Sequence, residues 1–190
     1  MSAALIYIHG FNSSPASFKA RVLKNALAQR APAVAFMAPA LPHAPRAAAA
    51  LLDALVAAQP GAVLVGSSLG GYYATWLAER HALRAVLVNP AVRPYELLAG
   101  HIGRQKNLYT GEEYEFTRAH VDELRALECA TIMPQRYFLM VETGDEVLDY
   151  RHAVERYRGA RQLVIEGGDH GFSDFEKYLD AVFEFGSFAA

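Results

Sequence analysis

Short runs of apolar residues recur along the chain and alternate with segments in which apolar residues return every three or four positions. Glycine, proline, asparagine or aspartate bounds each run, which is typical of buried strands in a mostly parallel sheet. About six strands are predicted in this way, at residues 5–8, 34–37, 63–65, 85–88, 137–141 and 162–165.

The segments between these runs have the period of amphipathic helices. Residues 18–27, 48–55 and 175–183 are examples, with aromatic residues, alanines and leucines at helical spacing. This alternation predicts a doubly wound α/β fold with helices on both faces of the sheet and right-handed crossovers. Because 190 residues suffice for one such core and leave little for a second, residues 1–190 are expected to form a single domain.

One connection is too long for a simple crossover. Residues 91–136 are rich in charge and tyrosine and are expected to form a small helical insertion. An insertion of this length is often a lid or a wall over a substrate site, but an ordinary helical excursion has the same pattern. Both interpretations remain open from the sequence.

The composition limits the kinds of molecule that the protein is expected to bind. Apolar residues make up 53% of the chain, the net charge is −2, and the basic residues are scattered, which does not favour binding to nucleic acid or to an anionic membrane. Cys129 is the only cysteine, so an intrachain disulfide and a cysteine-rich metal site are excluded. Residues 1–10 lack the pattern of a signal peptide, and a proline and glycines interrupt the uncharged residues 54–78. No membrane span and a cytoplasmic location are therefore expected.

The sequence AVLVGSSLGGYYATW at residues 62–76 carries the first candidate for chemistry. The pattern Gly-x-Ser-x-Gly fits it only from Gly66 to Gly70, which makes Ser68 the central serine. A strand that turns directly into a helix leaves room only for small residues two positions before and after the corner, and it lifts the corner side chain above the carboxyl ends of the strands. The alternative, a phosphate-binding turn, lacks the Gly-x-x-x-x-Gly-Lys and Gly-x-Gly-x-x-Gly patterns. Ser68 is therefore predicted to be a nucleophile.

A serine nucleophile needs a base, and the base needs an acid to orient it. Among seven histidines, His170 lies in GGDHGF directly after the last predicted strand. Asp145 follows the predicted strand 137–141 on the same edge of the sheet, and the order Ser68, Asp145, His170 is that of α/β-hydrolases. Four nearby carboxylates are weaker candidates for the acid: Glu142 at the strand end, Glu146, Asp149 as a helix N-cap, and Asp169.

Backbone N–H groups are expected to stabilise the oxyanion. One should come from Leu69, directly after the nucleophile, and the other from Phe11 in the loop IHGFNSS. His9 is expected to hold this loop by hydrogen bonding, and Ser13 or Ser14 to cap the next helix. This chemistry requires no metal and no organic cofactor.

Several of these motifs together resemble the bacterial YqiA-like esterases, small single-domain serine hydrolases of the α/β-hydrolase superfamily. They are IHGFNSSP, VGSSLGGYYATWLA, VNPAVRPYELL, YTGEEY, TGDEVLDYR and EGGDHGF, and they cover nearly the whole chain. The resemblance implies the α/β-hydrolase fold and hydrolysis of carboxylic esters with short to medium acyl chains. It also implies Ser68 as nucleophile, Asp145 as acid and His170 as base, in agreement with the assignment from the residues.

Two other functions remain open from the sequence. The same triad serves an acyl-CoA thioesterase, whose phosphates Arg93, Arg104 or Lys106 would meet, although such charges are more often solvated. A non-catalytic binding module on a hydrolase scaffold is also compatible with the fold, but it would not need all three side chains. In each case the expected partner is a small molecule.

Overall fold

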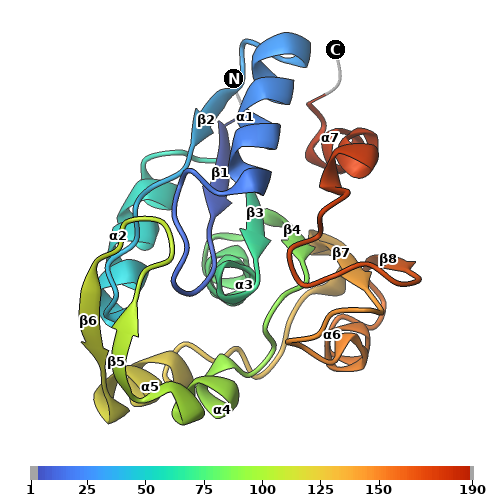
Figure 1. The fold of residues 1–190 in the computed structure, drawn as a ribbon. Helices are drawn as coiled ribbons and strands as arrows, with labels where there is room; N and C mark the ends of the chain where they lie inside the picture. The colour runs from blue at the N-terminus through green and yellow to red at the C-terminus, as the bar shows by residue number, and fades with distance from the viewer. Residues whose placement is uncertain (1–3, 189–190) are drawn as a thin grey trace.

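The computed structural model describes residues 4–188 and contains a sheet of six parallel strands (Figure 1). Each predicted strand is confirmed, with ends that differ by at most two residues. The strands are β1 (Ala4–Ile8), β2 (Ala35–Met37), β3 (Val63–Ser67), β4 (Arg84–Val88), β7 (Tyr137–Glu142) and β8 (Arg161–Ile165).

The strand order across the sheet is β2-β1-β3-β4-β7-β8. After β1 the chain forms β2 at the edge of the sheet, and it then crosses back over β1 to form β3 on the other side of β1. Because every neighbouring pair is parallel, the carboxyl ends of all six strands lie along one edge. In open α/β sheets ligands bind outside this edge, at the point where the strand order reverses. Here that point lies between β1 and β3.

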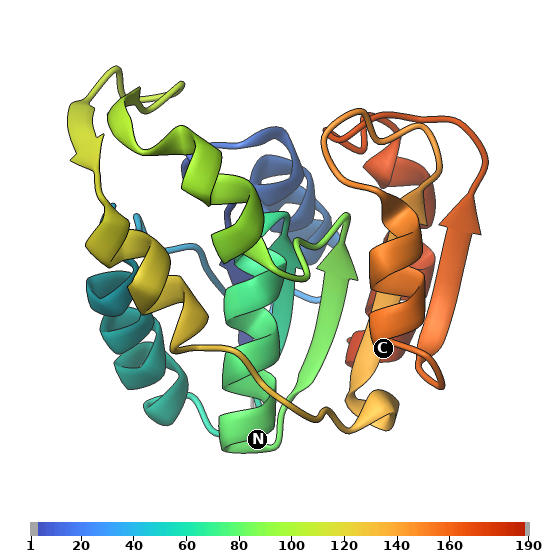
Figure 2. The same cartoon turned by 90° about the horizontal axis from the view of Figure 1, so that it is seen from below.

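Helices cover both faces of the sheet, as predicted (Figures 1 and 2). Helices α1 (Phe18–Arg30) and α7 (Leu179–Gly186), with the 3-10 turn η3 (Phe175–Tyr178), pack on one face. Helices α2 (Pro45–Ala57), α3 (Leu69–His81) and α6 (Tyr150–Arg156) pack on the other. The longest helices have 13 residues, and none within residues 4–188 has the length and apolar character needed to cross a bilayer.

Alternate residues of β1 explain why the strands are apolar throughout. Leu5 and Tyr7 belong to the buried cluster under α1 and α7, whereas Ile6 and Ile8 belong to the cluster under α2 and α3. All five residues of the strand are buried. A strand covered on both faces cannot alternate between apolar and polar residues, and this produces the continuous apolar runs in the sequence.

Residues 91–136 contain a hairpin that the sequence did not predict. Helix α4 (Pro94–Leu98), the turn η1 (Ala99–His101), helix α5 (Arg118–Arg125) and the turn η2 (Pro134–Arg136) surround it. The hairpin consists of the antiparallel strands β5 (Gly103–Lys106) and β6 (Glu113–Phe116). It was missed because alternate residues of both strands are charged and exposed, so neither strand forms an apolar run.

The hairpin is bonded to the loop that follows β1. The Leu108 N–H donates to the Asn12 carbonyl (3.0 Å), and the Asn107 side-chain amide donates to the Ser13 carbonyl (2.9 Å). The Tyr114 hydroxyl lies 2.7 Å from the Asn12 side-chain oxygen, to which it donates a hydrogen bond. These contacts support the interpretation of the insertion as a wall beside this loop. Motion of residues 91–136 as a lid stays a prediction.

The start of α3 lies directly against the end of β1, and glycines permit this contact. A Cβ atom at Gly70 would lie 1.9 Å from the carbonyl oxygen of Ile8, and one at Gly66 would lie 2.4 Å from the carbonyl oxygen of Gly70. Both distances are far below van der Waals contact, so a larger residue would have to move the backbone. The expectation that only small residues fit at these two positions is confirmed, and here even a Cβ atom would clash.

Gly70→Ala is expected to destabilise the protein by at least about 2 kcal/mol, because its Cβ would push α3 away from β1. Gly100→Ala is the matched control, since Gly100 also lies in a helical turn but has no atom within 4 Å of its Cβ position. This control should change stability by less than about 0.5 kcal/mol. Urea unfolding measures both variants, and equal stability of the two would contradict the close contact.

Candidate active site

Ser68 occupies the corner between β3 and α3 in a strained backbone conformation with a positive φ (φ 54°, ψ −121°). For a residue with a side chain such a conformation costs roughly 1–3 kcal/mol and persists only where its surroundings hold it. Three hydrogen bonds do so: the Ser68 N–H donates to Val88 (3.1 Å), and its carbonyl accepts from Gly71 (2.9 Å) and Ala91 (3.1 Å). The corner is thereby fixed to the end of β4.

The structure brings Ser68, His170 and Asp145 together. The Ser68 hydroxyl oxygen lies 3.1 Å from Nε2 of His170. The other ring nitrogen, Nδ1, lies 2.8 Å from Oδ2 and 3.0 Å from Oδ1 of Asp145. The His170 side chain is 21% exposed and that of Asp145 only 2%, so the ring meets solvent and the carboxylate does not. The three residues come from the ends of β3, β7 and β8, which lie on one edge of the sheet.

Asp145 is held as a carboxylate. Burial opposes its ionisation, but hydrogen bonds with the His170 ring and from the backbone N–H groups of Leu148 (2.8 Å) and Val147 (2.9 Å) outweigh it and lower the pKa of this carboxyl. Hydrogen bonds that favour the charged form have this effect. A carboxylate with every oxygen engaged can set the orientation and tautomer of the imidazole beside it.

Residues 166–174 form the loop that carries His170, called the His170 loop below. Asn89, which follows β4, holds this loop. Its side-chain amide donates to the carbonyls of Asp169 (3.0 Å) and His170 (3.3 Å), and its side-chain oxygen accepts from the N–H of Glu142 (3.0 Å). Asn89 is 2% exposed and has a positive φ of 40°. Sequence reasoning gave Asn89 no role. The available signal was a polar residue at the carboxyl end of a buried strand.

Three charged side chains hold the same loop through its backbone. They are Glu142, which accepts from the Asp169 N–H (2.8 Å), Glu146, which accepts from the His170 N–H (3.0 Å), and Lys19, which donates to the Gly171 carbonyl. Glu142 lies at the end of β7, as predicted, and Asp149 caps α6, as predicted. Burial raises the pKa of Glu142, and the neighbouring Asp174 raises it further, whereas the hydrogen bond from the Asp169 N–H lowers it. The net pKa is raised. The weaker candidates Glu142 and Glu146 therefore bind the backbone of the His170 loop, at Asp169 and His170, and neither is hydrogen-bonded to the His170 ring.

The loop after β1 lies against the serine. A Cβ atom at Gly10 would lie 3.2 Å from Cβ of Ser68 and 3.6 Å from its hydroxyl oxygen. His9 is buried, bonds to the Gly10 carbonyl through Nδ1 (3.0 Å) and accepts the Leu41 N–H at Nε2 (3.3 Å), so its predicted role in holding the loop is confirmed. Within residues 4–188, the backbone N–H groups of Phe11 and Leu69 have no hydrogen-bond acceptor.

The predicted cap of the next helix is wrong. Helix α1 begins at Phe18, and its N-cap residue is Ser17, whose side chain makes no capping hydrogen bond. Ser17 Oγ bonds instead to the Tyr7 hydroxyl (3.3 Å), and Ser14 Oγ accepts from Ala16 in the preceding turn (3.0 Å). That turn delays the helix by several residues and leaves its first N–H groups without a side-chain cap.

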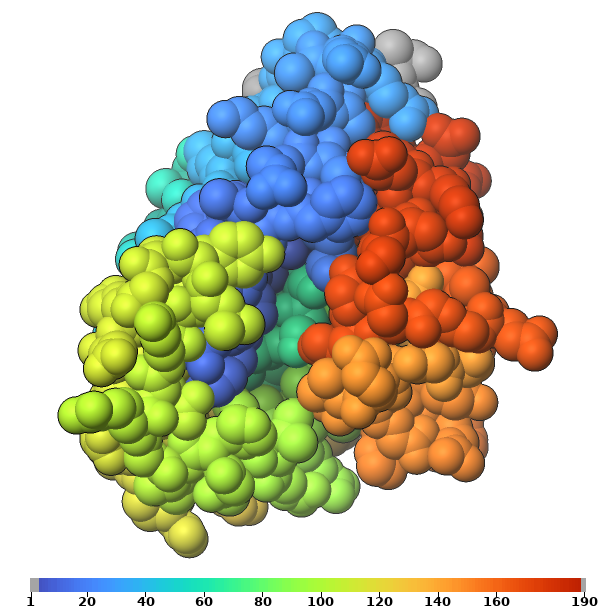
Figure 3. Space-filling model, viewed as in Figure 1, coloured from blue at the N-terminus to red at the C-terminus, as the bar shows by residue number. Residues whose placement is uncertain are grey.

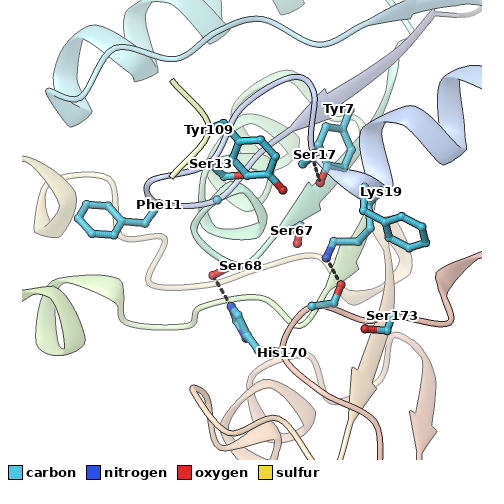
Figure 4. A pocket seen from close by; sticks show the side chains of 13 residues that line it. Tyr7, Phe11, Ser13, Ser17, Lys19, Ser67, Ser68, Tyr109, His170 and Ser173 are labelled. Atoms are coloured by element: carbon cyan, nitrogen blue, oxygen red, sulfur yellow. Dashed lines mark hydrogen bonds between the residues drawn. The ribbon is translucent and has the colours of Figure 1, made fainter. Parts of the chain in front are cut away.

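A cavity of about 360 Å³ opens beside Ser68 and His170, and Phe11, Lys19 and Tyr109 also line it (Figure 4). On the surface it belongs to a groove between the insertion on one side and the His170 loop with α6 on the other (Figure 3). A larger cavity of about 750 Å³ between α3, α4 and α6 is lined by neither Ser68 nor His170. The smaller cavity is thus the one next to the candidate nucleophile.

The strand order, the strained serine after β3, and the carboxylate and histidine after β7 and β8 define the class of α/β-hydrolases. The fold is similar to that of Est1E from Butyrivibrio proteoclasticus with ferulic acid bound (TM-score 0.70, 16% identity, covering 96% of this chain and 87% of that one). It is also similar to mouse alpha/beta hydrolase domain-containing protein 10 (0.71, 16%, 97% and 90%) and to an esterase from a marine microorganism (0.60, 12%, 97% and 95%). At these identities the likeness shows the fold.

The family follows from the sequence match. The family described as "Uncharacterised protein family (UPF0227)", the YqiA family, matches residues 4–187. The chain therefore belongs to this family, and the resemblance found in its motifs is confirmed.

Asn89→Ala is expected to destabilise the protein by about 2 kcal/mol or more, because it leaves the buried N–H of Glu142 and two carbonyls of the His170 loop without their partner. Hydrogen exchange of residues 166–174 should also become faster. Asn25→Ala, on the exposed side of α1, is the control and should change neither property. Unchanged stability and exchange in Asn89→Ala would contradict its role in holding the loop.

Proposed function

We propose that this protein is a serine hydrolase that cleaves carboxylic esters with short to medium acyl chains, using Ser68 as nucleophile, His170 as general base and Asp145 as the orienting acid. The observation that carries the proposal is the unbroken line of hydrogen bonds from the Ser68 hydroxyl through both ring nitrogens of His170 to the buried Asp145 carboxylate. The likeness in fold to proteins described as esterases supports a hydrolase.

In the first half of the reaction His170 Nε2 takes the hydroxyl proton as Ser68 Oγ attacks the ester carbonyl carbon. The tetrahedral intermediate collapses to an acyl-serine, and the same proton passes from His170 to the departing alcohol. In the second half His170 takes a proton from water, which attacks the acyl carbon and releases the acid. Asp145 keeps its negative charge throughout and stabilises the imidazolium that forms twice in each cycle.

The N–H groups of Phe11 and Leu69 are proposed to bind the oxyanion. Two observations support this proposal. Neither N–H group has a hydrogen-bond acceptor within residues 4–188, and Gly10 and Leu69 lie on two sides of Ser68. The start of α3 adds the positive end of a helix dipole at the same place. Loss of one such donor typically raises the barrier by about 3 kcal/mol. The cavity of about 360 Å³ lies at the lower end of the usual range for ligand pockets, which supports a small substrate.

Acyl-CoA thioesters are the second candidate substrate. Arg104 and Lys106 lie exposed on β5 of the hairpin, and neither forms an ion pair with another described residue. Comparing turnover of acyl-CoA and oxygen esters of one acyl group at several salt concentrations decides between them. An acyl-CoA thioesterase that binds the CoA phosphates should lose its preference for acyl-CoA as salt screens those phosphates.

Ser68→Ala is expected to lower kcat for a p-nitrophenyl ester by at least about 10⁴-fold, because no other side chain takes over the attack. Circular dichroism should show an unchanged fold. The control is Cys129→Ala, since burial raises the pKa of this thiol and makes it a poor nucleophile, and its kcat should match the wild type. Full activity in folded Ser68→Ala would refute the proposal.

Asp145→Asn is expected to lower kcat by roughly 10³–10⁴-fold with little change in KM, because an amide can donate to Nδ1 and stabilise the wrong tautomer of His170. Asp149→Asn is the control: Asp149 is a neighbouring carboxylate that caps α6 and is not bonded to His170. Steady-state kinetics measure both variants. Activity of Asp145→Asn within tenfold of the control would show that another group orients the base.

A further inference from the structure

The mechanism leaves one buried charge in the cavity without a role. Lys19, the second residue of α1, is only 8% exposed, yet its side chain lines the cavity beside Ser68 and His170 (Figure 4). Its ammonium donates to the carbonyl of Gly171, the residue after His170. The Lys19 ammonium therefore lies in the wall of the cavity, against the backbone of the His170 loop.

The ammonium of Lys19 forms no ion pair with a carboxylate in the part of the chain that the structure describes. Burial lowers its pKa to about 8, against the attraction of Asp169, Glu142 and Asp145, so it is mostly protonated at neutral pH. No ion pair among residues 4–188 includes Lys19. An ammonium has three N–H donors, and among the described residues only the Gly171 carbonyl accepts from that of Lys19. A buried cation with donors to spare is costly unless something else binds it.

The rest of the cavity suits a small anion. Among residues 4–188, no aspartate or glutamate lines it, and six lining side chains besides Ser68 carry hydroxyl groups: Tyr7, Ser13, Ser17, Ser67, Tyr109 and Ser173. Helix α1 also begins here, with no acidic residue in its first turn and no side-chain cap, so the positive end of its dipole faces the same space. An alkyl chain would leave the spare N–H groups of Lys19 without an acceptor, whereas a carboxylate can accept from them.

We propose that Lys19 binds a carboxylate carried by the substrate, so that the protein prefers esters in which a carboxylate lies a few bonds from the ester carbonyl. This inference rests on the proposed ester hydrolysis and adds the substrate class to it. The carboxylate can belong to the acyl part, as in a half-ester of a dicarboxylic acid, or to the alcohol part, as in an acylated hydroxy acid. A single ammonium in a small cavity matches the single charge of a carboxylate better than a phosphate dianion.

The test compares carboxylate esters with neutral carboxamide analogues of the same shape. The first pair, monoethyl glutarate and its carboxamide, places the group on the acyl side, and the second, 3-acetoxypropanoate and 3-acetoxypropanamide, places it on the alcohol side. The wild type should prefer the carboxylate by at least about tenfold in kcat/KM in one pair, mainly through KM, because a charge-assisted hydrogen bond is lost in the amide.

Lys19→Met should reduce this ratio to about one or below, and Lys19→Arg should keep most of it because the positive charge remains. Lys24→Met removes an exposed charge from the same helix and should leave the ratio at its wild-type value. A role of Lys19 limited to holding Gly171 predicts a different result, an equal loss for both members of a pair, and that result would overturn the inference.

The outcomes for the wild type separate the two proposals. Turnover of the neutral carboxamides without preference for either carboxylate would overturn the inference and leave ester hydrolysis standing. Absence of turnover for all four esters, by folded wild-type protein, would count against the proposed function and the inference with it.

Discussion

The contact of α3 with the end of β1 is the constraint on which the site depends. Gly66 and Gly70 bring the backbones within a distance that no side chain would permit, and Ser68 between them adopts its strained conformation with a positive φ. The strain at Ser68 is balanced by hydrogen bonds that tie the corner to β4 and to the residues after it. The serine oxygen is thus placed by the sheet itself and does not depend on a flexible loop.

The same edge of the sheet also places the histidine. The His170 loop has little regular structure, but side chains from β7, from α1 and from the residue after β4 bind its backbone. Each of these residues is polar and buried, which is expensive unless every group is paired. The apolar core therefore provides the stability of the fold, and a small polar network at the carboxyl edge provides the geometry of the site.

Sequence reasoning was most reliable where the signal is local. Continuous apolar runs mark strands covered on both faces, and the glycines around Ser68 mark a corner whose crowding lies within a few residues. Asp145 and His170 follow from the rule that parallel strands share a carboxyl edge, and the structure brings both to Ser68. The β5–β6 hairpin has exposed charges along its strands and therefore no apolar run.

Lys19 and Asn89 could not be predicted because their partners are distant in sequence. In the sequence Lys19 resembles any polar residue near the start of a helix. Its ammonium, however, donates a hydrogen bond to the carbonyl of Gly171, 152 positions away. Asn89 is explained only by contacts with Glu142, 53 positions away, and with the His170 loop, 80 and 81 positions away. In both cases burial of the polar side chain is a property of the tertiary structure, and for Asn89 the sequence offers only its position at the end of an apolar run.

The most direct test of the account is the site of reaction with a fluorophosphonate, which modifies serines activated by a neighbouring base. The folded protein should take up one equivalent, and mass spectrometry of its peptides should place the adduct on Ser68 alone, with no reaction after unfolding in urea. An adduct on any other residue, or none in the folded protein, would contradict the claim that this corner of the backbone makes Ser68 a nucleophile.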